Sequence, residues 1–218
     1  MKKMFFMALM VFVGLQAQAQ IVSSRSSMTT RQVIEEHKNY TGWSTFGLEY
    51  LPSKMVPDHG DSESYNGFAI NYTQALSLTQ SAPLFFEWGI GAQWSHWSDS
   101  EDRYEQSFNF VSMKVPFNLI YDYQLPNSSI NIDPYVGLQL RGNVWGEGKE
   151  EYYDDSDTWD LFDDDEGECK RFQLGWQIGA KVRFNNSFFV GVAYGSDFSE
   201  FAEDTKISEF KLSLGLVF

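Results

Sequence analysis

One histidine has neighbours that could support hydrolytic chemistry. His96 follows Ser95 directly and precedes Asp99 and Glu101 in the same polar segment. A histidine that activates a serine and is oriented by a carboxylate forms a catalytic triad. A single histidine at the end of a strand is, however, far more often an ordinary loop residue. We therefore expect no catalytic residues and no cofactor, and we keep a lipid-modifying enzyme centred on His96 as an alternative.

The acidic segment 147–168 has the composition of a cation site. It holds twelve aspartate and glutamate residues and one lysine, and clustered carboxylates are typical Ca²⁺ ligands. The candidates for cation contact are Asp163, Asp164 and Asp165. An EF-hand frame that starts at Asp155 lacks the loop glycine and places Trp159 where an oxygen ligand belongs. A solvated loop explains the segment better, and its aromatic residues are typical of a recognition surface.

An alternation of large apolar residues with small or polar ones indicates which elements position these groups. The last residues of the chain place five large apolar side chains on one face of a strand, from Phe210 to Phe218. The same period occurs in eight segments, which are predicted as strands: about 43–51, 65–75, 84–95, 108–123, 132–142, 171–184, 187–195 and 207–218.

The composition of the two strand faces predicts a membrane protein. The large face carries no charge, and a charged side chain in the middle of a bilayer would cost about 2–4 kcal/mol. The small face lacks the pattern of lysine and glutamate that covers a soluble sheet. Long connections are expected after the odd strands, at about 52–64, 96–107, 142–170 and 196–206. The sequence therefore predicts an all-β fold, an eight-stranded antiparallel up-and-down transmembrane β-barrel with long extracellular loops and short periplasmic turns.

Charged residues on the small face are predicted to fill the interior of this barrel. Eight strands enclose a space that side chains just fill, so the charges must pair with one another. Counting positions along neighbouring strands pairs Glu49 with Lys211 and Glu87 with Lys114. A polar core is the favoured interpretation, and a proton or solute path is the alternative. A porin is disfavoured because eight strands leave no aqueous channel.

The N-terminus predicts export to the outer membrane. Residues 1–19 have a basic start, an apolar run and a small-x-small cleavage site, which is the form of a signal peptide. Residues 20–41 are predicted as a periplasmic lead-in and 42–218 as the outer-membrane β-barrel domain. The formal net charge of −14 disfavours nucleic acid as a partner. The single cysteine, Cys169, cannot form an internal disulfide, and its acidic surroundings argue against a catalytic role.

Several short motifs resemble a known family. They are Pro83-Leu-Phe-Phe-Glu-Trp-Gly-Ile-Gly91, Val115-Pro-Phe-Asn-Leu119, Pro134-Tyr-Val-Gly-Leu138 and the terminal Phe218. Over 42–218 the chain is similar to the small outer-membrane β-barrel proteins of Bacteroidetes-type bacteria, sometimes called PorT-like. The resemblance implies the fold and the compartment, and the terminal aromatic resembles the signal read by the barrel-assembly machinery. Most members of the family lack a known activity, so no functional residues carry over.

The sequence thus predicts a non-enzymatic outer-membrane protein with a structural or surface-recognition role through acidic extracellular loops. Its expected partners are outer-membrane lipid, the barrel-assembly machinery and a surface glycan or protein. A component of a secretion or envelope-assembly machine is an alternative, as the PorT-like resemblance implies. The enzyme centred on His96 is the third hypothesis.

Overall fold

The computed structural model describes residues 40–79, 81–101, 104–152, 155–163 and 169–218. The predicted signal peptide, 1–19, and nearly all of the predicted lead-in, 20–41, lie outside the described residues. In the described ranges no helix has the length and apolar character needed to cross a membrane. The first described residue of the barrel unit is Tyr40.

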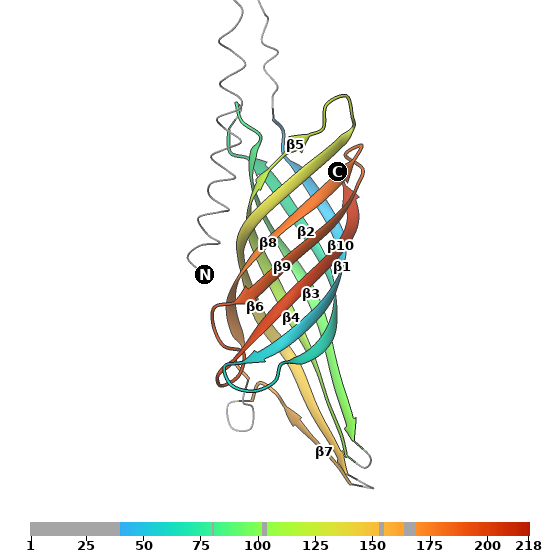
Figure 1. The fold of residues 1–218 in the computed structure, drawn as a ribbon, viewed down its shortest axis with the longest axis vertical. Coiled ribbons are helices and arrows are strands. Elements are labelled where there is room, and N and C mark those ends of the chain that lie inside the picture. Colours follow the sequence, from blue (N-terminus) through green and yellow to red (C-terminus); the bar gives the residue numbers. More distant parts are fainter. Residues whose placement is uncertain (1–39, 80, 102–103, 153–154, 164–168) are drawn as a thin grey trace, which may run out of the picture. The chain divides into compact units, whose positions relative to one another are not determined.

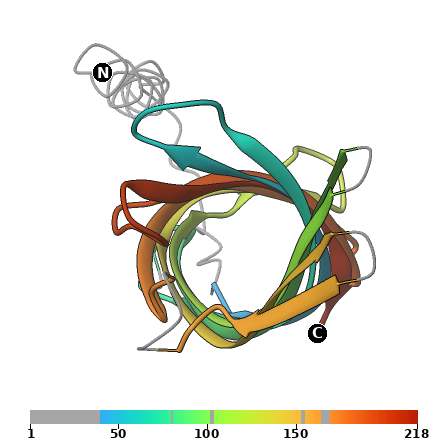
Figure 2. The same ribbon diagram turned by 90° about the horizontal axis from the view of Figure 1, so that it is seen from below.

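Ten strands are assigned within the described residues: β1 (Trp43–Pro57), β2 (Glu63–Ser77), β3 (Leu84–Glu101), β4 (Tyr104–Tyr121), β5 (Tyr123–Gln124), β6 (Ile130–Tyr152), β7 (Asp155–Asp160), β8 (Phe172–Phe184), β9 (Phe188–Asp197) and β10 (Thr205–Val217). Eight of them, all except β5 and β7, form one antiparallel ring, which closes because β4 pairs with β6 and β1 pairs with β10. Figure 1 shows this ring from the side and Figure 2 shows it along its axis. The predicted eight-stranded antiparallel barrel is confirmed.

The apolar face of each barrel strand points away from the barrel axis. On β10, Leu214 is 59% exposed and Leu216 is 61% exposed, whereas Lys211 is only 5% exposed. The same outward placement holds for large apolar side chains all around the ring, including Phe46, Leu48, Phe68, Ile70, Trp88, Ile90, Val136, Leu138, Ile178, Val190 and Val192. Such a surface is stable only against lipid, so the predicted orientation is confirmed.

The two ends of the barrel differ in their connections. The first and last barrel strands meet at one end, where the Ser44 amide donates to the Phe218 carbonyl at 2.8 Å. At the same end β8 turns into β9 through Asn185 and Asn186, both in the left-handed region with φ of 52° and 49°. Asparagine tolerates this conformation, which a tight hairpin needs. Short turns and both barrel termini mark this end as periplasmic.

The opposite, extracellular end contains more strand than the sequence predicts. The expected loop at 96–107 is a hairpin, because β3 continues to Glu101 and β4 begins at Tyr104. The expected loop at 142–170 also consists largely of paired strand, since β6 continues to Tyr152 and pairs with β7. These strands carry polar residues on both faces, so an alternation of apolar and polar residues does not predict them. Backbone pairing in water does not need a lipid-facing side.

The extended parts of β3, β4, β6 and β7 form a four-stranded sheet beyond the barrel wall, seen at the lower end of Figure 1. We call residues 97–101, 104–109, 147–152 and 155–160 the projecting sheet. Among the described residues its two outer strands have one neighbour each: β7 pairs only with β6, and β3 has lost β2 beyond His96.

A β-bulge in β6 directs the projecting sheet. Val111 pairs with Trp145 and Ser112 with Asn143, so Val144 is an extra residue and reverses the side-chain direction beyond it. Gly148 therefore lies on the inner face, where a Cβ would collide with the Trp159 ring. The absence of a side chain at this position lets β7 lie close against β6.

Two apolar clusters lie toward the ends of the barrel interior. The extracellular cluster buries Tyr65, Phe110, Leu161, Phe162, Phe201 and Ile207. Its segments are also joined by backbone hydrogen bonds, because Lys170 donates to Phe201 at 2.6 Å and Leu161 to Gly146 at 3.1 Å. The periplasmic cluster contains Ala75, Phe85 and Ile120. We refer to the first as the extracellular cap. The extracellular cap covers the polar residues that lie on its periplasmic side in the barrel interior.

The lipid-facing orientation predicts a cost for charge that depends on depth. Leu214→Arg, in the middle of the outward face of β10, should lower the free energy of unfolding by about 2–4 kcal/mol, because the guanidinium enters hydrocarbon. The matched control is Ser208→Arg, near the extracellular boundary on the same strand, which should cost about 0–1 kcal/mol. Urea unfolding in lipid vesicles measures both. Equal costs for the two variants would contradict the assigned depth.

Candidate functional site

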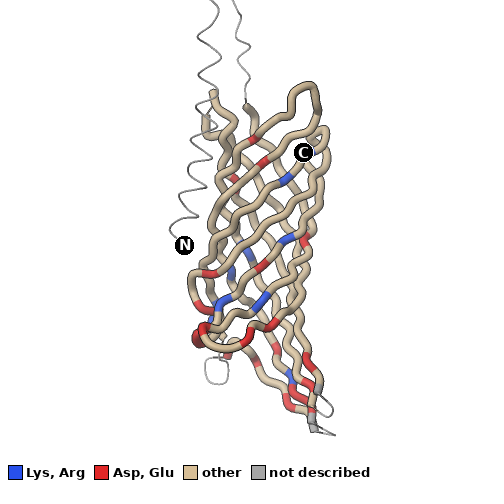
Figure 3. The backbone as a smooth tube through the Cα atoms, viewed as in Figure 1, with Lys and Arg blue, Asp and Glu red and all other residues tan. Residues whose placement is uncertain are grey.

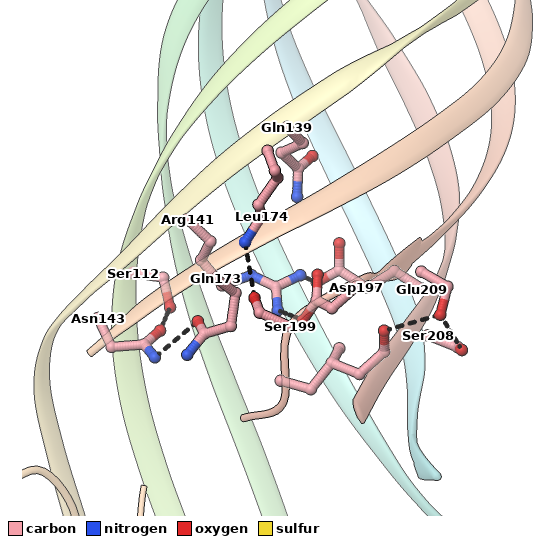
Figure 4. A network of polar contacts seen from close by, with 12 residues as sticks. Ser112, Gln139, Arg141, Asn143, Gln173, Leu174, Asp197, Ser199, Ser208 and Glu209 are labelled. Atoms are coloured by element: carbon pink, nitrogen blue, oxygen red, sulfur yellow. Dashed lines mark hydrogen bonds and ion pairs between the residues drawn. The ribbon is translucent and has the colours of Figure 1, made fainter. Parts of the chain in front are cut away.

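The barrel interior contains a network of ion pairs centred on Glu209 of β10. Lys114 of β4 donates to Glu209 Oε2 at 2.8 Å, and Arg141 of β6 contacts Glu209 Oε1 at 2.8 Å. The other guanidinium nitrogen of Arg141 donates to Asp197 of β9 at 2.9 Å. Gln93 of β3 also donates to Glu209, at 3.2 Å. Figure 4 shows Arg141 beside Asp197 and Glu209, and the network joins residues of five strands, β3, β4, β6, β9 and β10.

A second group of polar contacts surrounds Glu87 of β3. Its carboxylate accepts hydrogen bonds from Lys181 at 2.6 Å, Asn118 at 2.8 Å and Thr73 at 2.8 Å. Glu87 is 1% exposed, so each of these bonds replaces lost hydration. Toward the periplasmic end, Arg183 of β8 forms a third group.

Arg183 is held by two ion pairs and by one aromatic contact. It donates to Asp133 at 2.5 Å and lies 3.0 Å from Asp122. Its guanidinium also lies 3.7 Å from the ring centroid of Trp43, a cation–π contact that shields the charge from the periplasmic side. Every interior cation of the barrel is thus matched by carboxylate or amide oxygens.

The structure corrects the predicted ion pairs Glu49–Lys211 and Glu87–Lys114. The four residues do lie on the inner face of the barrel. Their partners differ, because Lys114 pairs with Glu209 and Glu87 with Lys181. Lys211 donates to Gln139 and Gln177 and lies 3.8 Å from Glu209.

The register explains this error. Glu49 pairs across β1 and β10 with Ser213, not with Lys211, and Glu87 pairs with Asn118 while Lys114 pairs with Gly91. The observed ion pairs Lys114–Glu209 and Lys181–Glu87 join strands that are not neighbours in the sheet, and such contacts depend on the stagger of the whole ring. Glu209 was missed, although extending the alternation of the final strand past Lys211 would have placed it on the inner face.

Little empty space remains among these groups. A cavity of about 40 Å³ is lined by Glu49, Glu87, Lys114, Lys181 and Lys211, together with neutral polar side chains. This is room for a few waters at roughly 10–15 Å³ each. The interior is therefore a packed polar core beneath the extracellular cap, and its geometry is that of a stabilising network.

The residues around His96 do not come together. The His96 Nδ1 atom lies 2.9 Å from Asn109 Oδ1, and its ring stacks on Trp94 with the centroids 5.8 Å apart. Ser95 is fully buried on the opposite, inner face of β3, because successive side chains of a strand point to opposite sides. The hydroxyl and the imidazole therefore do not form a nucleophile and base pair.

The predicted cation contacts remain a prediction. Asp163 is exposed, and Asp164 and Asp165 lie outside the described residues. Within the ranges that the structure describes, no group of three or more histidine, cysteine, aspartate or glutamate side chains could hold a metal ion.

The projecting sheet concentrates negative charge. Acidic residues face each other directly at three positions across its strands: Glu105 with Glu151, Glu150 with Asp157, and Glu147 with Asp160. Figure 3 shows the resulting cluster of acids at the lower end of the view. Like charges at directly opposed positions of a sheet are destabilising, so this arrangement carries a cost that folding alone does not explain.

The negative charge of this sheet raises the pKa of two of its groups, Lys149 and Tyr104. Glu151 accepts a hydrogen bond from Lys149 at 2.8 Å and raises the pKa of that ammonium, and the charges of Glu105 and Glu147 act in the same direction. Glu150 raises the pKa of the Tyr104 hydroxyl by accepting its hydrogen bond. Both shifts have the sign expected of a strongly negative surface.

Together, the lipid-facing ring, the paired polar interior and the extracellular sheet define a small outer-membrane β-barrel protein. The family model of the outer membrane protein beta-barrel domain matches residues 60–199. The chain belongs to this family, and its place in the cell is the outer membrane. No curated protein matches it.

Several solved structures resemble the chain. Ail, the attachment invasion locus protein of Yersinia pestis, is 15% identical with a TM-score of 0.48, and the match covers 82% of this chain and 100% of that one. Neisserial surface protein A is 13% identical with a TM-score of 0.45, covering 80% and 95%. The outer membrane enzyme PagL is 13% identical with a TM-score of 0.44, covering 78% and 97%.

The network around Glu209 predicts an unequal response to removal of interior carboxylates. Glu209→Gln should lower the free energy of unfolding by about 3–5 kcal/mol, because it leaves Lys114 and Arg141 with an uncompensated buried charge. Urea unfolding in lipid vesicles provides the measurement.

The matched control is Glu49→Gln, which should have a clearly smaller effect. Within the described residues Glu49 takes part in no ion pair shorter than 4 Å. A larger loss for Glu49→Gln than for Glu209→Gln would restore the pairing that the sequence predicts.

Proposed function

We propose that this protein is a non-enzymatic surface-recognition protein, and that its projecting sheet binds a positively charged segment of a protein partner. The observation that carries the proposal is the direct opposition of acidic residues at three positions of a hydrogen-bonded sheet. A basic partner would remove this repulsion on binding. The barrel then acts as the membrane anchor of the sheet.

The projecting sheet has an ordered backbone, which favours binding of a partner. Its strands continue β3, β4 and β6 of the barrel without a break, so the carboxylates are held on a paired backbone. An ordered surface loses less conformational entropy on binding than a free loop does. Dense charge of one sign also steers a partner of opposite charge toward the site and speeds association.

The edges of the sheet favour a charge-based mode of binding over self-association. The free edge of β7 carries Asp157 and Asp160, and that of β3 carries Asp99. Charged side chains on an exposed edge strand oppose pairing with a second copy of the same edge. A basic segment would experience the opposite effect.

The other two hypotheses are less well supported. A component of a secretion or envelope-assembly machine, and the Bacteroidetes PorT-like relationship behind it, rest on the sequence motifs alone. A lipid-modifying enzyme would need a nucleophile beside His96, and the side chain within hydrogen-bond distance is the amide of Asn109. Ca²⁺ contact through Asp163, Asp164 and Asp165 is a variant of the proposal in which a cation replaces the basic partner.

The proposal predicts that binding depends on where charge is removed and not only on how much. In lipid nanodiscs the protein should bind a fluorescent oligolysine peptide, and the binding should weaken as salt rises. The variant Glu147→Gln, Glu150→Gln, Glu151→Gln, Asp157→Asn should lose most of this affinity. Fluorescence anisotropy measures each dissociation constant.

A matched control removes four acids from other extracellular connections. Asp58, Asp61, Glu203 and Asp204 are exposed and lie outside the projecting sheet. Asparagine or glutamine at these positions should leave peptide binding nearly unchanged. Equal losses in the two variants would reduce the effect to net charge and overturn the assignment to the sheet. Replacing the peptide by Ca²⁺ in the same assay tests the cation variant.

A further inference from the structure

Two lysines on the outer wall of the barrel differ from the other basic residues. In the described part of the chain, lysines and arginines form ion pairs almost throughout: Lys114, Arg141, Lys149, Lys170, Lys181, Arg183 and Lys211. Arg171 lies over the Phe162 ring, 5.8 Å from its centroid. Lys54 and Lys206 form no ion pair with any described residue. In a chain with a net charge of −14, unpaired ammonium groups are unexpected.

The two lysines are close neighbours on adjacent strands. Lys54 of β1 pairs with Ser208 of β10, and Lys206 pairs with Val56. They are therefore diagonal neighbours, separated by two positions, which long side chains bridge readily. Both belong to the outward face, because the residues between them in register, Met55 and Ile207, belong to the extracellular cap.

Their depth is the boundary between hydrocarbon and headgroups. On the periplasmic side of Lys54, the outward positions of β1 include Tyr50, Leu48 and Phe46. On the periplasmic side of Lys206, the outward positions of β10 include Phe210 and Leu212. A lysine at this level lays its apolar stem against the wall and keeps its ammonium among the headgroups.

Hydroxyl groups flank the lysines on both sides. Lys54 pairs with Ser64 on β2 as well as with Ser208 on β10, and Ser208 pairs with Ser196 on β9. The Ser208 hydroxyl donates to that of Ser196 at 3.0 Å, which leaves the Ser64 hydroxyl as the donor beside Lys54. Ammonium and hydroxyl donors together are the groups that bind phosphate oxygens in proteins.

No carboxylate among the described residues forms an ion pair with either lysine. Glu200 lies close enough for Lys206 to lower its pKa, but Lys170 dominates that shift and donates to the same carboxylate at 2.7 Å. Within the described ranges, the ammonium groups of Lys54 and Lys206 are thus available to an anion from outside the chain. At this depth the surrounding anions are those of the lipid.

We propose that Lys54 and Lys206 form a binding site for the phosphate of a phosphorylated lipid headgroup in the outer leaflet, with Ser64 as an additional donor. The site is separate from the projecting sheet and has the opposite charge. It would fix one lipid against the β1–β10 junction, where the first and last strands close the ring.

The test uses the full-length protein in non-ionic detergent and diphosphorylated lipid A as the probe. Native mass spectrometry or a titration should show saturable binding, and Lys54→Gln, Lys206→Gln should weaken it by roughly 25-fold, about fivefold for each lysine removed. Lys149→Gln, which removes one paired lysine of the projecting sheet, matches the charge change of each single variant, Lys54→Gln or Lys206→Gln, and should bind as the parent does. Heat-modified mobility on gels confirms that each variant is folded.

Three results would overturn the proposal. One is unchanged lipid A binding by the double variant. Another is equal binding of lipid A from which the phosphates have been removed. The third is competition by inorganic phosphate at the concentration of lipid A, which would assign the lysines to a free anion. Peptide binding by the projecting sheet should persist in the double variant, so failure here leaves the proposed function standing.

Discussion

The structure depends on one constraint: inside a bilayer, every backbone amide and carbonyl must find its partner within the protein. Pairing of β4 with β6 and of β1 with β10 closes the ring and satisfies this requirement at all edges. Closure at eight strands also fixes the size of the interior. The polar side chains enclosed there have lost water and must satisfy one another, so the lumen becomes a packed core and not a channel.

The interior meets this demand by matching charges in groups along the barrel axis. Glu209 joins Lys114 and Arg141, Glu87 joins Lys181, and Asp133 joins Arg183. The first two groups connect strands that are not neighbours in the ring and so tie the wall together across the lumen, whereas Asp133 and Arg183 join the adjacent strands β6 and β8. The extracellular cap covers this network with aromatic side chains and limits its access to water. A barrel built in this way is a rigid anchor.

Charge is distributed differently in the three regions of the molecule. Inside the barrel, the bases are matched by carboxylate or amide oxygens. At the outer boundary of the wall, Lys54 and Lys206 present positive charge to the headgroups. Beyond the membrane, the projecting sheet carries acids that oppose one another at Glu150 and Asp157 and at two similar positions. The first arrangement stabilises the fold, whereas the other two have unbalanced charge and are explained best by partners outside the chain.

The sequence by itself determined the eight lipid-facing strands and the side to which each residue points, because a period of two is a local property that each strand carries in full. It placed Glu49, Glu87, Lys114 and Lys211 in the lumen correctly. Their partners were decided by the tertiary structure, since a contact across the lumen depends on the register and stagger of all eight strands. The projecting sheet was decided in the same way: its strands are polar on both faces, and only their pairing, redirected by the bulge at Val144, distinguishes them from loops.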